Sequence, residues 1–184
     1  MNIGILFSKI RVEEKLLIEE MKKRRNVTLK LIDSRKLIIN PEDNLGIDVL
    51  LDREIASSKA LHVVEMLKNS TVRCINSYDV IRICGDKVFT SRWLSKKGVP
   101  TPRIKVAFTK ESALEAIEEM GYPVVLKPVD GSWGRLIAKI ENKNSALAIL
   151  EHKSYLSSFD HSIFYLQEYI NKPDRDIRVL MIDD

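Results

Sequence analysis

Lys127 stands at the end of an apolar stretch, and a loop with two glycines follows it almost at once. Residues 124–126 have the length and character of a buried strand, which would hold the lysine rigidly at the mouth of a cleft. In the loop 130–134, glycine lets backbone N–H groups approach phosphate oxygens closely. Ser132 adds a hydroxyl donor and Arg135 a fixed positive charge. The segment therefore has phosphate-binding chemistry, although it is not a Walker-type loop, because a strand rather than a helix follows.

A second polar segment comes at the end of the apolar run 164–170 and continues through a short basic loop to Asp176. A strand that leaves its sheet into a hinge exposes backbone N–H and C=O groups, which can bind the edge of an adenine ring. A carboxylate such as that of Asp176 can accept hydrogen bonds from ribose hydroxyls. The segment could hold the nucleoside part of a nucleotide.

The third segment is Cys84-Gly85-Asp86-Lys87, at the expected start of a helix. A lysine in the first turn faces the positive end of the helix dipole, and a bound phosphate would relieve that conflict. Taken alone, each of the three segments also has an ordinary structural explanation. They could be a glycine hairpin behind an exposed lysine, a surface hairpin with paired charges, and a solvated lysine.

Taken together, in this order and spacing, the three segments resemble the LysX/RimK branch of the ATP-grasp ligases. The resemblance covers the whole chain. It is carried by Gly85-Asp86-Lys87, Tyr122–Pro128, Gly131–Leu136, Gln167–Ile170 and Asp176–Arg178, with further similar strings at residues 10–15, 82–87, 151–153 and 172–178.

The resemblance implies an ATP site and a role for each matching residue. Lys87 and Lys127 would contact the phosphates, with Lys127 also near the adenine, and Asp176 would hold the ribose. Arg178 would be the catalytic residue, near the phosphate or acyl-phosphate end. The flexible loop over the phosphates would consist of Gly131, Ser132, Trp133, Gly134 and Arg135. The hinge that holds the adenine, chiefly through backbone groups of its last two residues, would consist of Gln167, Glu168, Tyr169 and Ile170.

The resemblance also implies a reaction, in which ATP activates a carboxylate as an acyl phosphate and an amine then displaces phosphate. In this branch the carboxylate is the C-terminal glutamate of the acidic carrier protein LysW, in lysine biosynthesis, and the amine is that of 2-aminoadipate or glutamate. The branch binds Mg²⁺ through residues that we expect beyond residue 184, so no metal ligand is assigned here. The chain reads as truncated and, by itself, inactive, from an enzyme that could form a homo-oligomer. The alternatives are a RimK-like ligase that adds glutamate to a protein tail, and a short, catalytically inactive nucleotide-binding protein.

Composition limits the classes of protein to which the chain can belong. Of its 184 residues, 45% are hydrophobic and 30% charged, with a net charge of +4, as in a folded globular protein. No apolar run approaches the roughly 18–20 residues that cross a bilayer, and no secretory signal is visible. Basic residues are not interleaved with aromatics as in a nucleic-acid binder. We expect a cytoplasmic protein with no membrane or nucleic-acid partner, in which Cys74 and Cys84 are buried free thiols rather than a disulfide.

The elements that must position these residues follow from apolar periodicity. The first half alternates strands and helices, which predicts an α/β domain with an open parallel sheet over residues 1–90, the pre-ATP-grasp domain. Its strands are expected at 2–7, 27–32, 47–51 and 72–75, and its helices at 11–24 and 56–67. The apolar stripe of the first helix would consist of Val12, Leu16, Leu17 and Met21.

A helix from residue 85 or 86 to about 97 leads to the stiff break at 98–102, where two prolines prevent further helix. Residues 91–184 then predict a partial ATP-grasp domain of α+β class with an antiparallel sheet. Its strands are expected at 104–108, 123–127, 136–140, 164–170 and 177–182, and its helices at 111–120 and 144–152.

Overall fold

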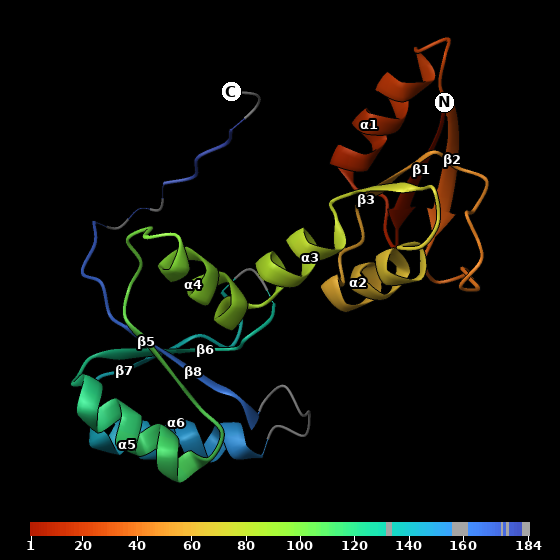
Figure 1. Ribbon diagram of the computed structural model, residues 1–184. Coiled ribbons are helices and arrows are strands. Elements are labelled where there is room, and N and C mark those ends of the chain that lie inside the picture. Colours follow the sequence, from red (N-terminus) through yellow and green to blue (C-terminus); the bar gives the residue numbers. More distant parts are fainter. Residues whose placement is uncertain (132–133, 156–161, 174, 176, 182–184) are drawn as a thin grey trace. The chain divides into compact units, whose positions relative to one another are not determined.

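The computed structural model describes residues 1–131, 134–155, 162–173, 175 and 177–181 (Figure 1). The chain forms two compact units, Met1–Thr90 and Ser91–Asp184. Each unit has its own sheet and its own apolar core. The described part of the chain contains no helix that is both long and apolar enough to cross a membrane.

The sheet of the first unit has the order β2-β1-β3-β4, and all of its strand pairs are parallel. This confirms the open parallel sheet expected from the alternation of strands and helices. The strands are β1 (Asn2–Phe7), β2 (Thr28–Asp33), β3 (Val49–Asp52) and β4 (Arg73–Ile75).

Helices cover both faces of this sheet. On one face α2 (Ser57–Met66) contributes Ala60, Val63 and Val64 to the larger core, as its periodicity predicted. On the other face α1 (Val12–Lys22) packs through Ile18 against Ile5 and Phe7 of β1. The unit continues through α3 (Tyr78–Gly85), where the Ser77 hydroxyl accepts a hydrogen bond from the backbone of Val80, into the first turn of α4 (Lys87–Lys96).

The predicted apolar stripe of α1 is wrong by part of a turn. Val12 and Leu16 are 69% and 59% exposed, whereas Glu14 and Ile18 are buried. The reason is that Glu14, a charged residue, is held inside by arginine side chains, and apolarity alone could not indicate it.

Gly4 in β1 has no room for a side chain. A Cβ added there would lie 2.7 Å from Cδ1 of Ile32 and 2.8 Å from Cδ1 of Ile47. We expect Gly4→Val to destabilise the first unit by about 1–3 kcal/mol, the usual cost of overpacking a core. Hydrogen exchange of β3 amides measures this loss, with Thr28→Val at an exposed position of β2 as the control; equal protection in both variants would contradict the prediction.

The second unit has an antiparallel sheet of order β5-β8-β6-β7, as predicted for this half of the chain. The strands are β5 (Ile104–Ala107), β6 (Val124–Lys127), β7 (Ala138–Ile140) and β8 (Phe164–Glu168). Two helices, α5 (Lys110–Met120) and α6 (Lys143–Ser154), cover one face of the sheet (Figure 1). They enclose a core that includes Ile117, Leu126, Leu150 and Leu166.

Two further expectations need correction. The strand expected at 177–182 is absent from its described part, because residues 177–181 are exposed and have no regular secondary structure. Alternating apolar side chains do not make a strand without a neighbour to complete the hydrogen-bond ladder. Cys74 and Cys84 are free thiols as expected, but neither is fully buried, because Cys74 is half-buried and Cys84 is exposed.

Candidate functional site

Lys127 and Gln167 meet on the sheet of the second unit. The Nζ atom of Lys127 donates a hydrogen bond of 2.7 Å to Oε1 of Gln167. β6 and β8 are neighbours, with Lys127 opposite Tyr165 and Val125 opposite Gln167, so both polar side chains leave the same face. That face is opposite the one that α5 and α6 cover through Leu126. Two segments proposed separately from the sequence are thus brought together.

Tyr165 lies on the same face and was not singled out from the sequence. Its side chain is 3% exposed, and its hydroxyl is 2.7 Å from the hydroxyl of Ser91 in α4. The signal that could have found it is the alternation of a strand, which places residues 165 and 167 on one face. This contact fixes the second half of α4 to the face that carries Lys127.

Glu168 points the other way and is tied to the start of β5. Its carboxylate accepts hydrogen bonds from the backbone N–H of Arg103 at 2.8 Å and from Nε of Arg103 at 2.7 Å. These bonds, the guanidinium bond first, hold the pKa of the Glu168 carboxyl below its ordinary value. The β8 ladder ends here, and Tyr169 and Ile170 continue it as exposed, irregular backbone. The role of these residues as a hinge stays a prediction, while the Glu168 side chain stabilises the contact between β8 and the start of β5.

Both glycines of the expected phosphate loop adopt a backbone conformation that favours glycine. Gly131 and Gly134 adopt φ angles of +86° and +68°, a region that side chains disfavour. Arg135 is exposed in the turn that follows. The expectations for Ser132 and Trp133 lie outside the described residues. A cation–π interaction lies near the expected hinge, where Nζ of Lys139 is 4.5 Å from the centre of the Tyr169 ring.

Lys87 belongs to the first unit and begins α4. The carboxylate of Asp86 caps this helix, accepting hydrogen bonds from the backbone N–H groups of Val88 at 2.7 Å and Phe89 at 3.1 Å. The negative charge of Asp86 offsets the conflict between Lys87 and the helix dipole. The sequence suggested a bound phosphate because Lys87 lies at the positive end of the helix dipole. Asp86 already offsets part of that unfavourable interaction.

The remaining expected positions are not assembled into a site. Asp176 lies outside the described residues, and Arg178 is exposed in a segment without regular secondary structure. Within the described ranges, no contact joins Arg178 to the other candidate residues. The same residues contain no group of three or more His, Cys, Asp or Glu side chains that could hold a metal ion. No Mg²⁺ ligand is therefore assigned among these described residues.

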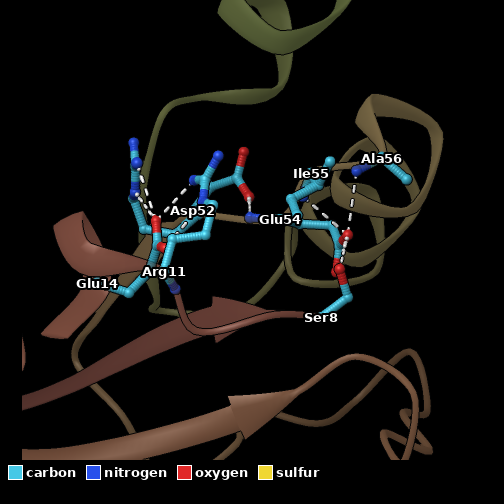
Figure 2. A network of polar contacts seen from close by, with 8 residues as sticks. Ser8, Arg11, Glu14, Asp52, Glu54, Ile55 and Ala56 are labelled. Atoms are coloured by element: carbon cyan, nitrogen blue, oxygen red, sulfur yellow. Dashed lines mark hydrogen bonds and ion pairs between the residues drawn. The ribbon is translucent and has the colours of Figure 1, made fainter.

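The structure also reveals a polar network at the carboxyl edge of the parallel sheet, which Figure 2 shows. The buried carboxylate of Glu14 accepts hydrogen bonds from Arg11 and Arg53. The hydrogen bond from the Arg11 side chain is the main cause that lowers the pKa of Glu14 from 4.5 to about 2. Next to it, Asp52 accepts a hydrogen bond of 2.9 Å from the backbone N–H of Glu54, and burial raises the pKa of Asp52.

Comparisons with known proteins agree with these two units. Residues 3–83 match the LysX preATP-grasp domain, and residues 84–184 match the RimK-like ATP-grasp domain. The RimK domain ATP-grasp protein from Sphaerobacter thermophilus has a similar solved structure, with a TM-score of 0.80 at 29% identity over 93% of this chain and 64% of its own. The fold is thus that of an ATP-grasp protein.

Two curated proteins are similar to this chain over nearly its whole length. The alpha-aminoadipate–LysW ligase LysX of Sulfurisphaera tokodaii is 34% identical over the whole of this chain and 66% of its own length. The glutamate–LysW ligase ArgX of Sulfolobus acidocaldarius is 33% identical over 99% of this chain and 64% of its own. The chain therefore spans slightly less than two thirds of the curated relatives it matches. It belongs to the RimK-like ATP-grasp family, in the branch that contains LysX.

Proposed function

We propose that the gene product carrying this chain is an ATP-dependent carboxylate–amine ligase, and that this chain supplies part of the ATP site. The observation that carries the proposal is the pairing of Lys127 with Gln167 beside a loop whose glycines have positive φ angles. A lysine fixed at a strand end and a neighbouring loop whose glycines adopt positive φ angles suit the phosphates of a nucleotide. The family matches over both units support the same assignment.

We propose for each residue the role that the family resemblance implies. Lys127 binds phosphate and is held in place by Gln167, and the backbone after Glu168 binds the adenine edge. The loop from Gly131 to Arg135 folds over the phosphates, and Lys87 supplies a further positive charge. Asp176 and Arg178 keep their proposed roles at the ribose and at the reacting end.

The proposed reaction has two steps. A carboxylate oxygen of the first substrate attacks the γ-phosphorus of ATP, and the bond to the bridging oxygen of ADP breaks. The amine of the second substrate then attacks the activated carbonyl carbon, loses a proton and expels phosphate, which leaves an amide. Positive side chains such as Lys127 stabilise the charge that moves between phosphate oxygens.

We propose that the carboxylate comes from the C-terminal glutamate of the carrier protein LysW and the amine from 2-aminoadipate or glutamate. The names of the relatives support both amines, because the LysX relative is named for alpha-aminoadipate and the ArgX relative for glutamate. The chain's net charge of +4 is compatible with an acidic carrier.

An assay of ADP release tests this function in the complete gene product. We expect ADP and phosphate to form only with ATP, carrier protein and amino acid together, and mass spectrometry should show the carrier heavier by one amide-linked residue. Comparing 2-aminoadipate with glutamate by kcat/KM identifies the amine. Nucleotide binding without ADP release under any of these conditions would instead support an inactive nucleotide-binding protein.

A further inference from the structure

The first unit has a topological switch point at the carboxyl edge of its parallel sheet. The strand order β2-β1-β3-β4 means that the chain passes to opposite sides of β1 when it forms β2 and β3. Open α/β sheets of this kind commonly bind ligands outside the carboxyl ends of the two strands at such a point, here β1 and β3. Arg11, after β1, and Arg53, directly after β3, both lie at this edge.

The two arginines share one carboxylate. Nε and Nη2 of Arg11 donate to Glu14 at 2.9 and 2.7 Å, and Nε and Nη2 of Arg53 both lie 2.9 Å from Oε1 of Glu14. Two guanidiniums and one carboxylate leave one positive charge. The Arg11 and Arg53 side chains are 36% and 34% exposed, whereas Glu14 is fully buried. Among the described residues the Nη1 groups of both arginines have no partner, so donors remain for a ligand.

The Glu14 carboxylate has a charged partner in Arg11 even without Arg53. The backbone N–H of Arg11 donates to Oε2 of Glu14 at 2.9 Å, and the Arg11 side chain reaches both carboxylate oxygens. Arg11 alone therefore pairs the buried charge. The contact with Arg53 adds a second guanidinium, held at a fixed orientation beside the first. Such a fork of planar donors matches the geometry of a carboxylate.

The neighbouring carboxylate of Glu54 is a useful comparison, because its hydrogen bonds only connect strand ends at this edge. It accepts hydrogen bonds from the hydroxyl of Ser8 and from the backbone N–H groups of Ile55 and Ala56, as Figure 2 shows. It also accepts a hydrogen bond from the hydroxyl of Ser34. These bonds tie the ends of β1, β2 and β3 together with one carboxylate satisfied by neutral donors. The Arg11–Glu14–Arg53 cluster differs because its donors are charged guanidiniums and because it keeps spare donors, with the carboxylate of Asp52 beside Arg53.

We infer that Arg11 and Arg53 bind a substrate carboxylate at this edge, with Glu14 as the residue that positions them. The inference deepens the proposed ligase function and rests on it. The carboxylate could belong to the acidic carrier tail or to the amino acid.

Binding measurements without ATP test the inference on the complete gene product. The probes are an acidic peptide ending in glutamate, the same peptide ending in glutamine amide, and 2-aminoadipate. We expect Arg53→Gln to weaken binding of the glutamate-ended peptide or of 2-aminoadipate by roughly 10-fold or more, the effect of losing a charge-assisted bidentate contact. Arg53→Lys keeps the charge without the fork and should weaken it less. The probe that responds identifies the source of the carboxylate.

Arg35→Gln is the matched control, since Arg35 follows β2 near the same edge but pairs with Asp33 and is 61% exposed. It should change binding less than 2-fold, by the small effect expected of an exposed pair. Hydrogen exchange of β1 amides checks that each variant is folded. Equal binding by Arg53→Gln and the parent, or an equal loss in Arg35→Gln, would overturn the inference. The affinity for ATP, measured in parallel, tests the proposed function separately, because we expect it unchanged in Arg53→Gln.

Discussion

Replacing Lys127 by methionine is expected to raise the KM for ATP by roughly 10- to 100-fold, because the variant loses a charge-assisted contact with phosphate while keeping the length of the side chain. The loss has a second cause. Oε1 of Gln167 accepts a hydrogen bond of 2.7 Å from Nζ of Lys127, and without this donor Gln167 loses its fixed orientation. The measurement is the ATP dependence of ADP release, together with equilibrium binding of ATP to the complete gene product.

The control for this variant is Lys143→Met. Lys143 begins α6 on the helix-covered side of the same unit, is 64% exposed and lies 3.6 Å from Glu118. Removing its charge should change the KM for ATP less than 2-fold, because an exposed pair contributes little. If both variants raised the KM for ATP equally, a general loss of positive charge would explain the increase. The assignment of a specific phosphate contact to Lys127 would then be wrong.

Glu14→Gln is expected to destabilise the first unit by about 2–4 kcal/mol at pH 7. The amide has nearly the same shape but leaves Arg11 and Arg53 without a counter-charge, and breaking one partner of a buried ion pair is costly. Partial exposure of both arginines moderates that cost. Hydrogen exchange of β1 amides reports the stability of this unit alone, whereas unfolding of the whole two-unit chain would not be a two-state measurement.

The effect of Glu14 on stability has a defined pH dependence. The pKa of Glu14 is about 2 in the folded protein, below the ordinary value of 4.5. The ionised carboxylate therefore stabilises the fold fully above pH 4.5, and this contribution is lost as the pH falls from about 4.5 towards 2. The parent and Glu14→Gln should converge in that range. Glu20→Gln, exposed on the same helix, should leave the stability of the unit nearly unchanged at pH 7. A stability difference between the parent and Glu14→Gln that is independent of pH would contradict the assignment to Glu14.

Local pattern was enough to predict both sheets. The spacing of Ala60, Val63 and Val64 identified α2 and its buried face, because a helix repeats every 3.6 residues whatever packs against it. The alternation of strands with helices predicted parallel pairing in the first half, since parallel neighbours need a crossover connection. The prediction of a strand at 177–182 was wrong over its described residues, because strand pairing depends on a neighbouring strand and not on the segment alone.

The sequence by itself determined the residue types available for phosphate chemistry and their order along the chain, including Lys127, the glycine loop and the run through Glu168. Only the tertiary structure decided which of them meet. It set Lys127 against Gln167, turned Glu168 towards Arg103, and buried Glu14 between Arg11 and Arg53. The physical reason is that strand register and the packing of a helix against a sheet fix contacts between residues far apart in the chain. Arg103 and Glu168, for example, are 65 positions apart. No local stretch of the chain contains this information.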